Sequence, residues 1–458
     1  MELTVGPRRF VAWLWHPVVI ATALGLAIRI GFVLIRPDFK AAGDAAYYHL
    51  EANLLASGQG WINPFLLIGS GHPHVADASF PPLFTLVLTA SSLVGFKSFF
   101  AHRMWCAVIG AAAVPLGAWV AREITTQPAS VPGPGRAASG WRTVQHWAPI
   151  LAAFGIAVYP NLWIPDGLGM SEALSPVLVL LVLGTAYRLW RAPSWQRAAV
   201  LGGVLALAAL ARDEMALLVV FILVPLALTR RVTWRERGRM LGAGLVVGAL
   251  VVGPWVGYNL SRFQDPVFIS DGLGITLASA NCDTTWHGTN TGYWSLACAV
   301  AAHPNPHVDE SVQGAEDQHF ALTYVRNNLG GLPRVELARL GRAFGLYRPV
   351  QQINLDVFFE SRPKTWAFAG LGMYYGLALL AIPGALLLYR RRITLLPMVA
   401  VLADVVISVL LTFGQTRYRS TFEPVLVLLA AVAVAACIQR LRRPAPVPDV
   451  PATTGGPA

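Results

Sequence analysis

Long apolar segments separated by short polar ones recur along the whole chain. A helix that crosses the hydrocarbon core of a bilayer needs roughly 20 predominantly apolar residues. Ten segments approach this length and carry few charges, and they lie near residues 17–36, 102–123, 147–164, 173–191, 197–212, 213–229, 240–259, 366–389, 394–412 and 422–440. The pattern predicts an all-α, polytopic membrane protein with about ten transmembrane helices.

The composition agrees with a membrane protein and excludes a soluble enzyme. Of the 458 residues, 55% are hydrophobic and 13% are charged, whereas an ordinary soluble domain has roughly 25% charged residues. The formal net charge of +11 would suit a nucleic-acid partner, but the arginines gather at the ends of the apolar segments and form no basic stripe. Membrane lipids are therefore expected as partners, and nucleic acid is not.

The charges also predict how the chain is oriented. With a cytoplasmic N-terminus, the cytoplasmic segments hold 19 of the 35 lysine and arginine residues in a small part of the loop length, whereas 19 of the 24 aspartate and glutamate residues face outward. An excess of positive charge in cytoplasmic loops is the rule for multi-pass proteins. The sequence thus predicts a multi-pass protein of the plasma membrane, with both termini in the cytoplasm and its polar chemistry outside.

Two outer segments are long enough to hold a functional site. The apolar run Pro81–Phe96 in the first of them is not a further span, because a crossing there would move the arginines of 230–239 and 390–392 to the outside. It is predicted to be a juxtamembrane helix at the outer surface. The predicted regions are a transmembrane module over 1–259 with an outer loop at 37–101, an extracytoplasmic region over 260–365, C-terminal transmembrane helices over 366–443 and a disordered cytoplasmic tail over 444–458.

The cysteines indicate an oxidising compartment for the second outer segment. Cys282 and Cys298 both lie there, and their separation suits a disulfide that closes a loop. A zinc site with His287 is the alternative, although two thiols and one histidine without a second CxxC motif are a weak signal. Cys106 and Cys437 fall within predicted spans, where a free thiol behaves as a small hydrophobic side chain.

The densest polar cluster directly follows the first span. From Asp44 onward, an acidic start, apolar and aromatic side chains at helical spacing, and a stop at Gly58 predict a short amphipathic helix. The pattern alone leaves two interpretations of Asp44 open. It is either the N-cap that binds the first backbone amides of this helix or an outward-facing functional carboxylate.

Several motifs, in a fixed order, extend over most of the chain. They are Gly43-Asp44…Tyr47-Tyr48…Leu54-Leu55-Ala56-Ser57-Gly58, Phe80-Pro81-Pro82-Leu83-Phe84, Met170-Ser171-Glu172-Ala173-Leu174, Ala211-Arg212-Asp213-Glu214, Gly253-Pro254-Trp255…Tyr258-Asn259 and Arg417-Tyr418-Arg419. With these motifs the chain resembles the GT-C superfamily of membrane glycosyltransferases, in particular its protein O-mannosyltransferase and aminoarabinose transferase-like branch. The resemblance implies a GT-C-type helical bundle with juxtamembrane helices and two large extracytoplasmic loops.

The resemblance also implies a reaction. Enzymes of this kind transfer a sugar from a polyprenyl-phosphate donor to an acceptor at the outer membrane face, usually with inversion, and an aspartate in the first outer loop acts as the base. Asp44 matches that aspartate, and a carboxylate suits the task because the acceptor hydroxyl must lose its proton. Glu172 matches the family's second carboxylate, although an acid that stabilises a helix N-terminus would also explain it. Tyr47, Tyr48 and His49 are then expected to contact substrate.

Two departures from the family pattern concern the substrates. Ala45 stands where many protein O-mannosyltransferases have an acid, so the acceptor is left open between a glycan, a lipid and a protein. The aminoarabinose branch has a lysine beside its juxtamembrane proline, whereas Phe80 precedes Pro81 in this chain. The donor phosphate must therefore be bound elsewhere.

Arginines are the candidates for phosphate binding, because a guanidinium offers a permanent charge and a planar pair of donors. They are Arg212, at the hairpin between the fifth and sixth spans, and the Arg417-Tyr418-Arg419 segment before the last span. An ion pair with a neighbouring acid would equally explain Arg212. Contact with lipid headgroups would equally explain the other two arginines.

The implied reaction requires no certain cofactor, and a divalent cation is left open. Asp44 with Glu172 could hold one, and His72, His74 and Asp77 have an HxHxxD-like spacing that is a weak metal signal. The alternative function is a transporter or flippase of a lipid-linked intermediate. It would be expected to show inverted repeats and helices broken at the midplane, whereas the polar clusters here gather at one face.

A labelling experiment tests the predicted orientation, which places residues 132–136 in the cytoplasm and His72–His74 outside. A cysteine introduced at His72–His74 should react with a membrane-impermeant thiol reagent in intact cells. A cysteine introduced at 132–136 should react only after the membrane is opened. Equal labelling of both positions from outside would refute the ten-span arrangement.

Overall fold

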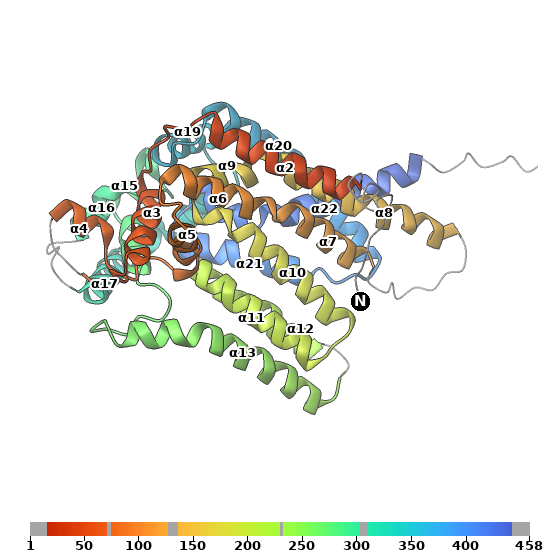
Figure 1. Cartoon of the computed structure of the whole chain (residues 1–458), viewed down its shortest axis with the longest axis horizontal. Coiled ribbons are helices and arrows are strands. Elements are labelled where there is room, and N and C mark those ends of the chain that lie inside the picture. Colours follow the sequence, from red (N-terminus) through yellow and green to blue (C-terminus); the bar gives the residue numbers. More distant parts are fainter. Residues whose placement is uncertain (1–15, 71–74, 127–135, 230–231, 303–308, 442–458) are drawn as a thin grey trace, which may run out of the picture.

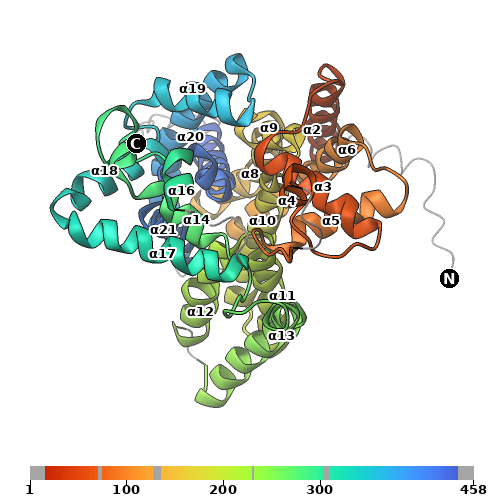
Figure 2. The same cartoon turned by 90° about the vertical axis from the view of Figure 1, so that its left-hand side faces the viewer.

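The computed structural model describes residues 16–70, 75–126, 136–229, 232–302 and 309–441. Long helices run roughly side by side along the long axis, and shorter helices gather at one end of them (Figure 1). A view onto that end shows the helices of the first predicted outer loop on one side and those of the second on the other (Figure 2). His72, His74 and the predicted tail lie outside the described residues.

The helices fall into two sets. The long-axis set is α2 (Pro17–Leu34), α6 (Phe99–Ala111), α7 (Ala113–Thr125), α8 (Arg136–Val158), α9 (Pro160–Leu168), α10 (Ser175–Arg191), α11 (Trp195–Ala211), α12 (Val224–Thr229), α13 (Trp234–Leu260), α20 (Lys364–Arg390), α21 (Leu396–Leu411) and α22 (Glu423–Leu441). The end set is α3 (Gly43–Ala56), α4 (Pro64–Ser70), α5 (Pro82–Leu93), α14 (Leu273–Ala280), α15 (Asp283–Trp286), α16 (Leu296–Ala302), α17 (Glu310–Asn327), α18 (Leu332–Ala343) and α19 (Pro349–Glu360).

The all-α membrane fold is confirmed, but the number of ten spans is not. Among the described residues, six helices are long and apolar enough to cross a membrane, and a seventh results if α8 and α9, bent by 45°, form one span. The helices α11 and α21 are apolar but have only 17 and 16 residues. The predicted span 213–229 is interrupted, because a 3-10 turn (η2, Asp213–Ala216) and a π turn (η3, Val219–Leu223) precede α12.

The run that was predicted to lie beside the membrane forms α5, whose 12 residues are too few to cross it. Its buried face packs against α3. The rings of Phe84 and Tyr48 have centroids 4.9 Å apart, and the Thr85 hydroxyl donates a hydrogen bond of 2.9 Å to Glu51. The helix therefore supports the element that carries Asp44.

The break between α8 and α9 leads the chain toward the polar end of the molecule. Tyr159 precedes Pro160 and has an extended backbone, because a proline disfavours the helical conformation in the residue before it. The second helix ends at Gly169, whose φ of 74° is the left-handed conformation that glycine adopts at helix ends. The 3-10 turn η1 (Ser171–Ala173) follows at once and carries Glu172.

The predicted disulfide is present, and it connects α15 to α16. Cys282 and Cys298 are bonded, with Cα atoms 5.9 Å apart. Both thiols are thus unavailable for zinc, and His287 instead lies 3.7 Å from Asp283. The disulfide tethers the part of the second outer segment that leads into Trp294.

Candidate active site

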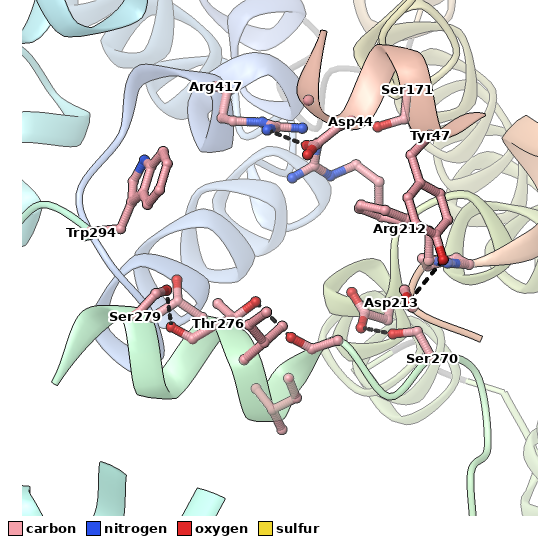
Figure 3. A pocket seen from close by; sticks show the side chains of 18 of the residues that line it. Asp44, Tyr47, Ser171, Arg212, Asp213, Ser270, Thr276, Ser279, Trp294 and Arg417 are labelled. Atoms are coloured by element: carbon pink, nitrogen blue, oxygen red, sulfur yellow. Dashed lines mark hydrogen bonds and ion pairs between the residues drawn. The ribbon is translucent and has the colours of Figure 1, made fainter. Parts of the chain in front are cut away.

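A cavity of about 1040 Å³ opens at the end of the bundle where the short helices gather. Its lining comes from α3, the turns η1 and η2, the second outer segment and the 3-10 turn η6 (Thr416–Thr421). Figure 3 shows side chains from these elements converging on one space. The volume lies at the upper end of the range for small-molecule sites, so it can hold a ligand with more than one sugar ring.

Asp44 lies on the first turn of α3 and faces the cavity with Tyr47 and Tyr48, which follow at helical spacing. The interpretation of Asp44 as an N-cap is wrong. The N-cap is Ala42, which has no side-chain capping bond. The Asp44 carboxylate, 32% exposed, instead accepts a hydrogen bond of 2.7 Å from Nη1 of Arg417.

Arg417, from η6, connects the two carboxylates that the motifs singled out. Its Nη1 atom contacts Asp44, and its Nε atom lies 2.7 Å from Oε1 of Glu172. Burial acts to lower the pKa of Arg417, but the negative charges of Glu172 and Asp44 outweigh burial and raise it well above its usual range. The guanidinium is therefore a permanent positive charge in the cavity wall.

Glu172 also binds a second arginine, Arg212, through the same carboxylate oxygen. Nη1 of Arg212 donates to Oε1 of Glu172 at 2.9 Å, and Nε of Arg212 donates to Glu214 at 2.5 Å. The pairing of Arg212 with a neighbouring acid is thus confirmed for Glu214. Glu172 is 2% exposed and lies behind the arginines, outside the lining of the large cavity. This placement makes it a residue that positions the arginines, not the catalytic group that was predicted.

The side chains of the Arg417-Tyr418-Arg419 segment, which lies on the 3-10 turn η6, point in different directions. Arg417 and Tyr418 line the large cavity, and the guanidinium of Arg212 lies 5.8 Å from the centroid of the Tyr418 ring. Arg419 is turned away and buried, with Nε 2.6 Å from Glu423 and the guanidinium over the Tyr374 ring. The prediction that Arg419 contacts the same ligand as Arg417 is therefore wrong.

Of the three residues that were expected to contact substrate, two line the cavity and one does not. Tyr47 and Tyr48 line the cavity, as predicted. The imidazole of His49 points elsewhere, because its Nδ1 atom lies 3.1 Å from Nδ1 of His102 and its ring packs on Phe99. Successive helical positions point in directions about 100° apart, so a residue next to two cavity-facing tyrosines need not share their face.

A polar network that the sequence did not reveal connects the two outer segments. The Tyr47 hydroxyl donates to Asp77. Glu310, from α17, accepts hydrogen bonds from Nδ2 of Asn63 at 2.6 Å and from the backbone amide of Ala78 at 3.3 Å. Asp77 and Glu310 are far apart along the chain, and no spacing or motif joins them, so no signal in the sequence could have paired them.

Burial raises the pKa of two carboxyl groups at this network, those of Glu310 and Asp271. Burial and then the charge of Asp77 raise the pKa of Glu310 well above its usual range, and the same two causes raise the pKa of Asp271 to about 7. Both groups line the cavity. This side of the cavity can therefore both accept and donate hydrogen bonds.

The divalent cation that the sequence left open between Asp44 and Glu172 does not fit the residues present. Arg417 contacts both carboxylates at 2.7 Å and fills the space between them. Among the residues that the structure describes, no three His, Cys, Asp or Glu side chains are grouped so that they could hold a metal ion.

The sequence matches no protein-family model and no curated relative. Among solved structures, the chain is similar to the archaeal oligosaccharyltransferase AglB from Archaeoglobus fulgidus in complex with an inhibitory peptide and a dolichol-phosphate, with a TM-score of 0.53 at 15% identity. The match covers 94% of this chain and 51% of AglB. The chain has the GT-C fold.

The GT-C fold agrees with the predicted class of helical bundle. This chain spans about half the length of AglB. A further similarity is to ArnT from Cupriavidus metallidurans bound to undecaprenyl phosphate, with a TM-score of 0.41 at 13% identity. It covers 94% of this chain and 78% of ArnT. At these identities the comparisons concern the fold, and the roles of individual residues rest on the geometry described above.

The role of Glu172 as the group that positions two arginines predicts a stability defect. Glu172→Gln keeps the size of the side chain but leaves Arg212 and Arg417 with less negative charge around them. Loss of one partner from a buried ion pair costs about 3–5 kcal/mol, so the melting temperature in detergent should fall clearly. Glu316→Gln, at an exposed position of α17, is the control and should melt like wild type. Equal melting temperatures of the two variants would contradict the role of Glu172.

Proposed function

We propose that this chain is an integral-membrane glycosyltransferase that moves a sugar from a polyprenyl-phosphate donor to an acceptor on the extracytoplasmic face of the plasma membrane. One observation carries the proposal. A partly exposed carboxylate, Asp44, lies in one cavity with two arginines, Arg212 and Arg417, at the end of a bundle of apolar helices. The GT-C fold supports the same kind of function, since the AglB structure that shares it was solved with a dolichol-phosphate.

The two arginines are suited to bind the phosphate of the donor. Among the described residues, their hydrogen bonds to carboxylates engage Nε and Nη1 of each guanidinium. Each Nη2 amino group is left to donate to a phosphate oxygen. Arginine is well suited to this task because its donors are planar and its charge is permanent. The ring of Tyr418 lies 5.8 Å from the guanidinium of Arg212.

Asp44 is suited to act as the base. The acceptor hydroxyl attacks the anomeric carbon, the bond from that carbon to the phosphate oxygen breaks, and the phosphate leaves with the bonding electron pair. The proton of the hydroxyl passes to Asp44, which must lie within hydrogen-bond reach of it. The leaving phosphate is held by Arg212 and Arg417 and is stable as an anion, so no strong general acid is required.

The direct contact between Asp44 and Arg417 bears on the stereochemical outcome. Inversion needs the base and the leaving phosphate on opposite faces of the sugar. The donor sugar would therefore enter between Asp44 and the arginines, and the phosphate would replace Asp44 as a partner of Arg417. Arg417 keeps Glu172 as its second partner throughout, so its position does not depend on Asp44.

A transporter or flippase is the alternative, and the structure offers it less support. Such proteins place the substrate site near the midplane, at the interface of two repeats. The cavity described here is lined by short helices and turns, and the short helices gather at one end of the bundle (Figures 1 and 2). Its carboxylate and arginine pair also supply the groups that a transfer reaction needs.

The different placement of Arg417 and Arg419 predicts that lysine substitutions have different effects. Arg417→Lys keeps the charge but loses the planar donor pair, and charged hydrogen bonds are worth about 1.5–3 kcal/mol, so sugar transfer should fall about tenfold or more. Arg419→Lys should mainly lower the melting temperature, because Arg419 is buried in an ion pair away from the cavity. Transfer from a purified polyprenyl-phosphate sugar, measured at a temperature where both variants are folded, checks this. Full activity of Arg417→Lys would assign the phosphate to other residues.

The role of Asp44 as the base predicts that Asp44→Asn is folded and nearly inactive. Removal of a general base typically lowers the rate about 10²–10⁴-fold. The melting temperature should change little, because Asp44 is partly exposed, does not cap α3, and Arg417 retains Glu172. Asp44→Ala should behave in the same way.

Asp38→Asn, at an exposed carboxylate just before α3, is the matched control for Asp44→Asn and should transfer sugar at the wild-type rate. Donor binding should be measured for all variants, so that a loss of catalysis is separated from a loss of substrate. Near-normal turnover by Asp44→Asn would remove this residue from the mechanism.

A further inference from the structure

Four aromatic side chains form a continuous surface along one side of the cavity, which we call the aromatic arc. They are Tyr418, Phe413, Trp294 and Phe359, and all four line the cavity. Successive ring centroids lie 5.3 Å apart for Tyr418 and Phe413, 6.4 Å for Phe413 and Trp294, and 4.8 Å for Trp294 and Phe359. Three separate segments supply these rings, namely η6 with its preceding loop, the loop before α16, and α19.

The arc begins at the proposed reaction centre and leads away from it. Tyr418 follows Arg417, which contacts Asp44, and Arg212 lies over the Tyr418 ring. Trp294 projects into the cavity from the side opposite Tyr47 (Figure 3). A molecule that lies along the arc can thus present one end to Asp44 while the rest of it contacts Trp294.

The cavity lining also contains apolar aliphatic side chains and a set of charged ones. Among the described residues that line it, seven are aspartate or glutamate and two are arginine. Both arginines are held by carboxylates at one end. Asp271, from the loop before α14, and Glu310 and Asp317, from α17, also line the cavity, and burial raises the pKa of Asp317 and of Asp271 to about 7. These groups accept hydrogen bonds, and in their protonated form they also donate them.

We infer that the aromatic arc is the subsite for a carbohydrate acceptor, whose ring stacks on Trp294 while its hydroxyl groups bond to the acidic wall. The inference rests on the proposed function and specifies the acceptor that it leaves open. A sugar ring has an apolar face of C–H groups and a rim of hydroxyls. The electron-rich face of an aromatic ring attracts the C–H groups, and carboxyl groups match the hydroxyls. Both kinds of side chain line the same cavity.

Two other acceptors fit the same surfaces less well. A polyanionic acceptor would lack a cationic partner, because Arg212 and Arg417 are the only basic side chains in the described lining and are assigned to the donor phosphate. An extended peptide can be bound by pairing with the edge of a sheet, but the described residues contain no strand, only an isolated bridge between Ile62 and Ala76, and offer no such edge. A lipid tail, by contrast, would contact aliphatic side chains of the lining such as Leu273 and Ile275 and would need no flat ring, and this difference from a sugar can be tested.

The test compares Trp294→Leu with Trp294→Phe in the full chain, purified in detergent. Leucine keeps an apolar surface but removes the flat ring, whereas phenylalanine keeps a ring. The acceptor probes are a panel of methyl hexosides and hexose trisaccharides, and a serine- and threonine-containing peptide serves as the competing acceptor. Transfer is followed from a polyprenyl-phosphate sugar. Binding of the trisaccharides without donor is followed by saturation-transfer NMR, which does not depend on activity.

We expect wild type to bind and glycosylate members of the sugar panel. Trp294→Leu should raise KM for the sugar acceptor about tenfold, since a stacking contact is worth up to about 1.5 kcal/mol beyond its area. KM for the donor and the rate of donor hydrolysis by water should stay unchanged. Trp294→Phe should lie close to wild type. Trp366→Leu, a partly exposed tryptophan of α20 outside the cavity lining, is the control and should not alter either KM.

The possible failures are distinguishable. Wild type that neither hydrolyses nor transfers any polyprenyl-phosphate sugar would overturn the proposed function, and the acceptor subsite with it. Transfer to the peptide alone would leave the function standing and overturn the subsite. A raised KM for the donor in Trp294→Leu would assign the arc to the lipid, and wild-type constants in that variant would show that the arc binds neither. Each of these last two results would also overturn the inference.

Discussion

The candidate site depends on one buried carboxylate. Oε1 of Glu172 accepts hydrogen bonds from Arg212 and from Arg417, and these arginines come from elements that are far apart in the sequence. Two guanidinium groups placed side by side would repel each other and would be costly to bury without a negative charge between them. Glu172 therefore makes their arrangement possible. Through Arg417 it also connects the membrane bundle to α3, where Asp44 lies.

The cavity around this cluster is built from two outer segments that are joined by polar contacts. The Tyr47 hydroxyl bonds to Asp77, while Glu310 binds Asn63 and the backbone beside Asp77. The disulfide between Cys282 and Cys298 tethers the chain that leads to Trp294. The result is a space with a basic end, an acidic wall and an aromatic wall. A phosphate, hydroxyl groups and a sugar face are the chemical groups that match these three surfaces.

The errors of the sequence-based prediction at the site have a common physical origin. His49 was grouped with Tyr47 and Tyr48, and Arg419 with Arg417, because they are neighbours in a motif. In helical structure, however, adjacent side chains point in different directions, so a motif identifies the element but not the face. Asp44 was assigned correctly to the start of a helix, yet its partner is Arg417 and not the backbone. Contacts between distant segments decided each of these points.

The sequence by itself determined the class of molecule and the position of its chemistry. The chain has ten apolar segments with arginines at their predicted cytoplasmic ends, and most of its acidic residues lie in the predicted outer loops. This pattern reflects the cost of placing charge in hydrocarbon. The cost applies to each segment separately, so the sequence of each segment is enough to recognise it. The tertiary structure alone decided which side chains meet. The pairing of Glu172 with two arginines, the hydrogen bonds of Glu310 to Asn63 and Ala78 and the aromatic arc join residues with no fixed spacing. Such contacts result from the packing of whole helices, and no local pattern encodes them.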